Sequence, residues 1–241
     1  FKMWYRAGSY YGTALATSKD GINWERGEYD VVPGTNLIMT PKETNFRDST
    51  ATIINPFAKI SSEKYSMFQT QDPTQPNKLV GKIYTSADGI HWTYRTSTSV
   101  IGDRSTMFYN PFRNKWVYSI RSYWHDRSRD YSESTSLIRG ANLENTVRWL
   151  RADNKDIKDP VIGDKPQLYN VDAVAYESIM LGAFQIYLGP HNNITDETGI
   201  PKVTNIHLGF SRDGFHFSRS EDRTAFLSCS QEAGTWNRGY L

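Results

Sequence analysis

The chain has very little cysteine and no long apolar run, and both shortages exclude classes of protein. The single cysteine, Cys229, excludes an intrachain disulfide and any cluster of thiolates that could hold zinc. No run of about 18 apolar residues occurs, so we predict no membrane-spanning helix. The sequence also lacks a His-Glu-x-x-His motif, a glycine-rich phosphate loop and a Gly-x-Ser-x-Gly elbow, which weighs against zinc proteases, nucleotide enzymes and serine hydrolases.

An excess of charge of one sign is missing as well. The 28 Lys and Arg residues against 26 Asp and Glu residues give a formal net charge of +2 over 241 residues. The basic residues are scattered along the chain, so the sequence has no electrostatic footprint for a polyanion. We therefore expect no nucleic acid among the partners of this protein.

Aromatic residues, in contrast, are abundant. They make up 14% of the chain and include 15 Tyr and 7 Trp residues. This bias suits pleated, half-buried strands, and it also suits sites at which sugars stack on rings. The hydrophobic share of 38% is enough to bury a core in one domain or in one array of repeats.

A seven-residue motif recurs and predicts hairpins. It begins at Ser18, Ser86 and Ser211, reads Ser-x-Asp-Gly-x-x-Trp or Phe, and has a degenerate fourth copy that closes at Trp149. Asp-Gly between apolar stretches favours a tight turn, because glycine takes positive φ without steric cost and aspartate bonds nearby backbone. We therefore interpret the aspartates of the motif as turn residues and not as catalytic carboxylates. These aspartates are Asp20, Asp88 and Asp213.

A second motif comes earlier in each unit. Three aspartates, Asp48, Asp103 and Asp172, each lead into a predicted aromatic strand, and the first two are followed by an Asn-Pro-Phe tripeptide. Strands therefore dominate the expected structure. Only the stretch from Ala141 to Lys158 has helical spacing, and we expect at most a short helix there.

The spacing of the two motifs predicts the fold. Units of roughly 55 to 70 residues with several short strands match the blades of a propeller. We predict an all-β, five-bladed β-propeller that forms a single domain over residues 1–241. Its first blade is expected to be incomplete, with the inner strand before Phe1. The expected units are 1–28 (partial), 47–96, 103–150, 170–220 and 226–241 (partial).

The Asp-Gly-x-x-Trp hairpins, the Arg47-Asp48 dipeptide and the carboxylate of Glu177 resemble the five-bladed β-propeller glycoside hydrolases, the group that includes families 32, 43 and 68. The resemblance covers nearly the whole chain as a blade pattern, although each motif is short. It implies a carboxylate nucleophile or base that would lie before Phe1, a stabilising aspartate and a general acid. The acid maps onto Glu177, and the aspartate maps onto Asp103 by blade order or onto Asp48 by the Arg-Asp order. A secreted or periplasmic location is implied by the resemblance alone.

Glu177 departs from the family pattern in the residues that follow it. The family has Glu-Cys or Glu-Gly-Pro, whereas Glu177 is followed by Ser178 and Ile179, so the chain is a divergent member or belongs to another propeller family. The flanking residues are apolar, and a lone carboxylate in an apolar strand is costly unless it titrates or is paired. Burial would raise its pKa as a general acid requires. The alternative is a structural acid that faces an arginine or water.

Further residues are candidates for binding a substrate. Asp172 has the same place in its unit as Asp48 and Asp103, so these acids either ring one pocket or bond backbone at strand entries. The guanidinium groups of arginines, which have several N–H donors, either bind sugar hydroxyls or bridge neighbouring strands. The loop at 123–127 has the composition of a sugar subsite, or is a loop with a tucked tryptophan. The substrate-binding candidates are Asp172, Arg104, Arg121, Trp124, His125 and Arg47.

These observations predict a glycoside hydrolase that cleaves an oligo- or polysaccharide in an axial pocket by paired carboxylate chemistry. A non-catalytic carbohydrate-binding propeller is the first alternative. A propeller that binds proteins through a flat apolar face is the second. We expect no cofactor, assign no metal ligands, and find no motif that indicates a structural calcium ion.

Overall fold

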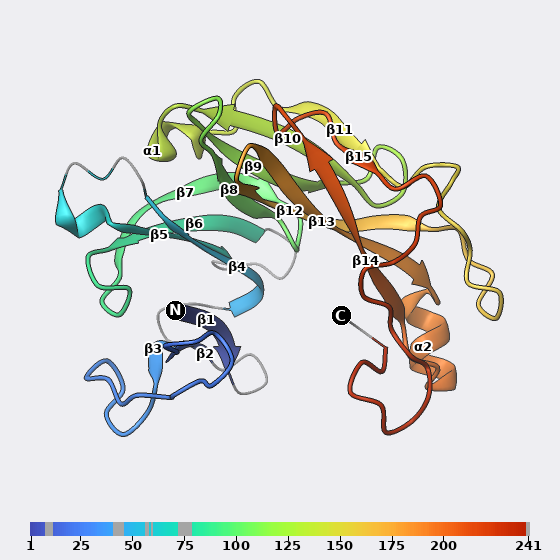
Figure 1. The fold of residues 1–241 in the computed structure, drawn as a ribbon, viewed down its shortest axis with the longest axis horizontal. Helices are drawn as coiled ribbons and strands as arrows, with labels where there is room; N and C mark the ends of the chain where they lie inside the picture. The colour runs from blue at the N-terminus through green and yellow to red at the C-terminus, as the bar shows by residue number, and fades with distance from the viewer. Residues whose placement is uncertain (8–11, 41–45, 56–57, 59, 72–78, 240–241) are drawn as a thin grey trace. The chain divides into compact units, whose positions relative to one another are not determined.

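The computed structural model describes residues 1–7, 12–40, 46–55, 58, 60–71 and 79–239, and for residues 46–50 and 71 it describes the backbone alone. Strands dominate these residues, and the helices are short (Figure 1). The elements are β1 (Lys2–Ala7), β2 (Gly12–Thr17), β3 (Leu37–Met39), β4 (Phe46–Ile54), η1 (Ser61–Glu63), β5 (Tyr65–Gln71), β6 (Leu79–Ser86), β7 (Thr93–Ile101), β8 (Thr106–Asn110), β9 (Lys115–Ser122), β10 (Ser128–Ser134), α1 (Leu137–Gly140), β11 (Val147–Arg151), β12 (Gln167–Tyr176), β13 (Ile179–Gly189), α2 (Asn192–Thr198), β14 (Val203–Ser211) and β15 (Ser218–Arg219).

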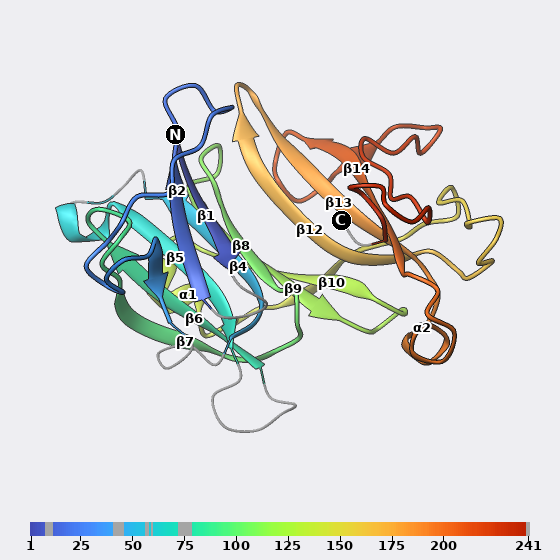
Figure 2. The same cartoon turned by 90° about the horizontal axis from the view of Figure 1, so that it is seen from below.

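The strands form four antiparallel sheets in which each strand pairs with its neighbours in the sequence. The sheets are β1-β2-β3, β4-β5-β6-β7, β8-β9-β10-β11 and β12-β13-β14-β15. Three of these sheets have four strands and the first has three. Antiparallel meanders of about four strands are the blades of a propeller. The long β12–β13 hairpin, whose register runs from Gln167↔Tyr187 to Tyr176↔Ile179, is the clearest example (Figure 2).

The predicted count of five blades is wrong for the part of the chain that the structure describes, which has four sheets. Residues 226–241 were expected to begin a further blade. The residues described within this range, 226–239, form only isolated β-bridges and no strand. The N–H groups of Phe226 and Leu227 instead donate to the carbonyl of Ile206 in β14, at 2.8 and 3.1 Å. The apolar run Phe226-Leu227 is too short to form a sheet of its own, so its backbone adds to an existing one.

The chain divides into two compact units. The first unit comprises Phe1–Thr106 and Ser136–Leu143 and holds the β1–β3 and β4–β7 sheets. The second unit comprises Met107–Thr135 and Glu144–Leu241 and holds the β8–β11 and β12–β15 sheets. No helix in the described ranges is long and apolar enough to cross a membrane.

Each unit has an apolar core between its two sheets. In the first unit the core joins residues of β2, β3, β5 and β6, and in the second it joins residues of β8, β9, β10, β12 and β13. Burying such side chains contributes on the order of 2 kcal/mol each. The core residues are Leu15, Ile38, Met39, Met67 and Tyr84 in the first unit, and Phe108, Val117, Tyr131, Ala173 and Met180 in the second.

The Asp-Gly motifs form turns, as predicted. The carboxylate of Asp20 accepts hydrogen bonds from the N–H groups of Ile22 and Asn23, both at 2.8 Å. The carboxylates of Asp88 and Asp213 accept the equivalent bonds in their turns. The bond from the Asn23 N–H, followed by that from Ile22, holds the pKa of Asp20 well below its ordinary value. These aspartates therefore stabilise their turns by accepting hydrogen bonds from backbone N–H groups.

The same turns also join the two sheets of each unit. The indole Nε1 of Trp4 on β1 donates to the carbonyl of Gly89 at 2.8 Å in the first unit. The indole Nε1 of Trp149 on β11 donates to the carbonyl of Phe215 at 2.6 Å in the second unit. A tryptophan of one sheet is thus bonded to the Asp-Gly turn of the next.

The helical prediction was misplaced. Within residues 141–158 the structure has strand β11, and α1 precedes this stretch. The Ser136 side chain accepts a hydrogen bond from the Arg139 N–H and so caps α1 at its N-terminus. Helix α2 was not predicted and ends at Gly199, whose φ of 71° is left-handed.

Two glycines with positive φ give a matched test of the joint at Gly89. Gly89 has φ +83°, and an added Cβ would lie 2.6 Å from Cζ2 of Trp4, whereas Gly34 has φ +77° with nothing within 4 Å. Gly34→Ala should lower the free energy of unfolding by about 1 to 2 kcal/mol, the cost of the left-handed backbone. Gly89→Ala should cost about 1 to 3 kcal/mol more, because it also displaces Trp4. Equal losses in urea unfolding would show that Trp4 does not hold this turn.

Candidate active site

Glu177 lies in a hairpin turn and not inside a strand. Tyr176 pairs with Ile179, so Glu177 and Ser178 form the two-residue connection between β12 and β13. Glu177 has φ 49°, and its side chain is exposed. The predicted burial of this carboxylate is therefore wrong. A two-residue hairpin loop projects beyond the sheet, so its side chains face solvent despite the apolar residues on either side.

Asp172 carries a carboxylate that the protein shields from water. It lies on β12, opposite Ala183 of β13, and the residue is half-buried. Desolvation raises the pKa of Asp172 from 3.8 to about 6, although the N–H of Ala173 and the charge of Arg129 oppose this rise. The Ala173 N–H donates to Oδ1 of Asp172 at 3.0 Å. This carboxyl group therefore exchanges its proton close to neutral pH.

Two arginines on neighbouring strands lie beside the first strand of the β12–β15 sheet. Arg121 on β9 and Arg129 on β10 are directly opposite each other, with exposed fractions of 7% and 0%. Nη2 of Arg129 donates to the carbonyl of Tyr169 and to Oδ1 of Asn170, both at 2.6 Å. Arg129 therefore ties the start of β12 to the sheet before it, within two residues of Asp172.

Tyrosine rings and guanidinium groups alternate next to this pair. The Arg121 guanidinium lies 5.0 Å from the ring centroid of Tyr123 and 4.8 Å from that of Tyr169. The Arg127 guanidinium lies 5.6 Å from the centroid of Tyr169 and 4.5 Å from that of Tyr187. We call these five residues the Tyr-Arg ladder. Cation–π contacts of this kind strengthen when they are desolvated, so the ladder holds the start of β12 firmly.

Tyr123 is the exposed ring at the end of the ladder. Its side chain is 63% exposed. The neighbouring Trp124 was a predicted substrate-binding residue, but Arg148 and Arg151 lie 5.4 and 5.8 Å from its ring. The ring that this loop offers to solvent is therefore that of Tyr123. His125, also predicted, is exposed at the surface, where its Nε2 lies 3.3 Å from Nζ of Lys165.

The other predicted residues belong to the first unit. Asp103 and Arg104 form the turn between β7 and β8; both are half-buried, and Arg104 has φ 58°. Arg47 and Asp48 lie on β4, and their side chains are outside the described part of the chain. The structure thus brings Asp172 close to Arg129, and it brings Arg121 close to Tyr123 and Tyr169.

Sequence reasoning missed Arg129, Tyr169 and Asn170. One signal was available, because Arg127 and Arg129 are two residues apart at the start of a strand and therefore share a face. The contact with β12 required the register between sheets, which no local pattern contains. Among the described residues, no group of three or more His, Cys, Asp or Glu side chains gathers as a metal site.

No protein-family model matches the chain, and no curated protein matches it in sequence. Solved structures do resemble it. An N-acetylgalactosamine deacetylase from F. plautii, solved with blood group B trisaccharide, has a TM-score of 0.61 at 14% identity over 93% of this chain and 64% of its own. An endo-1,4-beta-xylanase of Bacteroides thetaiotaomicron has a TM-score of 0.60 at 9% identity over 95% and 71%.

A fructofuranosidase of Schwanniomyces occidentalis, solved with fructose, has a TM-score of 0.54 at 15% identity over 93% of this chain and 43% of its own. The chain therefore spans from under half to about seven-tenths of the length of these three proteins. At such identities the likeness concerns the fold. Together with the four meander sheets, it shows that this chain has the β-propeller fold.

Proposed function

We propose that the protein hydrolyses glycosidic bonds and that Asp172 is its general acid. The observation that carries the proposal is the carboxyl group of Asp172, whose pKa is raised to about 6 by desolvation. Glycoside hydrolysis needs one carboxyl group that keeps a proton to donate to the leaving oxygen. Asp172 meets this requirement, and the exposed Glu177 has no comparable shielding from water.

Arg129 is a positioning residue in this proposal. Its two bonds to Tyr169 and Asn170 fix the backbone of β12 just before Asp172. Its positive charge also limits the rise of the Asp172 pKa. Without that charge the carboxyl would hold its proton to higher pH, and it would be a weaker acid towards a leaving group at neutral pH.

The mechanism also requires a second carboxylate, and the resemblance to the propeller glycoside hydrolases implies an aspartate in that role. The exposed ring of Tyr123 is the proposed platform for a sugar, because amphipathic rings pack against the apolar face of a ligand and leave its polar rim in water. The three similar structures support a carbohydrate substrate, since each is the structure of an enzyme that acts on a carbohydrate. We propose an oligo- or polysaccharide as the substrate.

The pH dependence of turnover tests the role of Asp172. A general acid must be protonated, so kcat on a panel of p-nitrophenyl and methyl furanosides and pyranosides should fall above pH 6, by about tenfold for each pH unit. The fall should be shallower for p-nitrophenyl glycosides than for methyl glycosides, because a good leaving group needs less protonation. The assay follows initial rates between pH 4 and pH 9.

Two outcomes would contradict the proposal. A rate that rises through pH 6 would indicate that Asp172 works in its ionised form. Saccharide binding without hydrolysis of any glycoside in the panel would favour the non-catalytic carbohydrate-binding propeller.

A further inference from the structure

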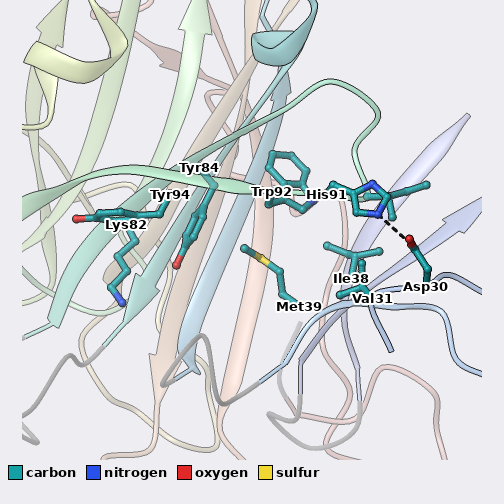
Figure 3. Close-up of a pocket in the computed structure, with 10 residues that line it drawn as sticks. Asp30, Val31, Ile38, Met39, Lys82, Tyr84, His91, Trp92 and Tyr94 are labelled. Atoms are coloured by element: carbon teal, nitrogen blue, oxygen red, sulfur yellow. Dashed lines mark hydrogen bonds and ion pairs between the residues drawn. The ribbon is translucent and has the colours of Figure 1, made fainter. Parts of the chain in front are cut away.

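A cavity of about 740 Å³ lies in the first unit, between the β1–β3 sheet and the β4–β7 sheet (Figure 3). Its walls come from the loop before β3, from β3 itself, and from β6, β7 and the Asp-Gly turn between them. Ligand sites typically have volumes of about 300 to 1,000 Å³. None of its lining residues takes part in the proposed hydrolysis.

The middle of the cavity is apolar and partly aromatic. Ile38 and Met39 of β3 are 2% and 4% exposed and belong to the core of the unit, so the cavity is continuous with the packed core. The Tyr94 side chain is 52% exposed, and its ring meets that of Tyr84 edge to face at a centroid distance of 5.8 Å. The hydroxyl of Tyr94 is already hydrogen-bonded to Oγ of Ser97 at 2.9 Å. Tyr94 therefore offers a fixed ring.

The two ends of the cavity carry opposite charges. Lys82 lies at one end, next to Tyr84 and Tyr94, and Asp30 lies at the other (Figure 3). The carboxylate of Asp30 is 2.9 Å from Nε2 of His91, and Nδ1 of His91 is 2.7 Å from Asp88. Each end thus provides hydrogen-bonding groups, and the lining has no marked excess of either sign.

We propose that this cavity is a second carbohydrate-binding site, which holds one or two residues of a neutral saccharide chain. A sugar ring has an apolar C–H face, which suits Tyr94, and a rim of hydroxyl groups, which suits Lys82 at one end and Asp30 with His91 at the other. A purely apolar ligand would make no hydrogen bonds with the groups at the two ends, and an anion would be repelled by Asp30. The choice of a saccharide as ligand rests on the proposed function, whereas the cavity itself does not.

Affinity electrophoresis of the whole chain through native gels tests the site, with soluble xylan, inulin or arabinan cast into separate gels. The wild-type protein should be retarded by at least one of them. Tyr94→Ala should weaken that retardation at least fivefold, because the ring is lost, and Lys82→Ala should weaken it by about two- to threefold. Tyr176→Ala is the matched control, since Tyr176 is 62% exposed and belongs to the second unit. This variant should migrate as the wild-type protein does.

Retardation that survives in Tyr94→Ala, with the thermal midpoint unchanged, would overturn the proposal. So would a wild-type protein that none of the three polysaccharides retards. Asp172→Asn separates this proposal from the proposed function, because it should remove hydrolysis and leave the Tyr94-dependent retardation intact. A wild-type protein that hydrolyses nothing, yet is retarded through Tyr94, would refute the hydrolase and support the second site.

Discussion

Asp172→Asn should lower kcat for glycoside hydrolysis by about 100- to 1,000-fold and should at the same time stabilise the protein at neutral pH. The loss of rate is expected because an amide cannot donate the proton that the leaving oxygen needs. The gain in stability is expected because ionising a desolvated carboxyl group is unfavourable in the folded state. A loss of activity together with a gain in stability would indicate that Asp172 serves catalysis and lowers the stability of the fold.

The sign of the stability change follows from linkage. The pKa of Asp172 is about 6 in the fold and near 3.8 in the unfolded chain. Well below pH 3.8 the group is protonated in both states, and stability is lost as the pH rises from about 4 to about 6, because over this range only the unfolded chain ionises readily. The variant lacks this loss. Its free energy of unfolding relative to the wild type should therefore be higher at pH 8 than at pH 4 by roughly 2 to 3 kcal/mol.

Urea unfolding at pH 4 and pH 8 measures this difference. Asp196→Asn is the control, because Asp196 is an exposed acid on α2 of the same unit and should change neither rate nor stability. If Asp172→Asn weakened the fold equally at both pH values, Asp172 would be an ionised structural acid and the proposed chemistry would lose its basis.

Asp156→Ala should lower the free energy of unfolding by about 3 to 5 kcal/mol. The Asp156 side chain is 1% exposed and receives two bonds of 2.7 Å from Nη1 and Nη2 of Arg219. Its Oδ2 also accepts the N–H of Asp153 at 2.7 Å. Removing the carboxylate would leave Arg219, whose side chain is 5% exposed, as a buried charge that has lost its best partner.

Chemical unfolding of two variants checks this effect. Asp153→Ala removes an acid that also bonds Arg219 and Arg223, but the side chain of Asp153 is 43% exposed. It should therefore cost less than about 1.5 kcal/mol. Similar decreases in the free energy of unfolding for the two variants would mean that burial does not determine how much each carboxylate stabilises the fold.

Several elements of the fold could be predicted from the sequence, because their signals are local. Asp-Gly turns are specified by two residues, and the structure has them at Asp20, Asp88 and Asp213. The extra blade was a wrong prediction because a short apolar pair such as Phe226-Leu227 can extend an existing sheet as easily as start one. The helix was misplaced because Val147 and Leu150 lie on β11, where pairing with β10 overrides weak helical spacing.

The candidate site was less predictable than the fold. Glu177 looked buried because apolar residues flank it, and no glycine or asparagine marked the turn. Asp172 was a candidate, but its shielding from water depends on packing around β12 that the sequence does not express. Arg129 was missed because its partners are 40 and 41 residues away along the chain.

The bond between a tryptophan and the following Asp-Gly turn has a consequence for how such a chain can lengthen. Since the turn is encoded within each repeating segment, a duplicated segment would arrive with its own attachment point for its neighbour. Trp4 with Gly89 and Trp149 with Phe215 are two copies of that attachment. Growth by tandem duplication would therefore need no new contact between sheets, because the tryptophan and the Asp-Gly turn would be duplicated together.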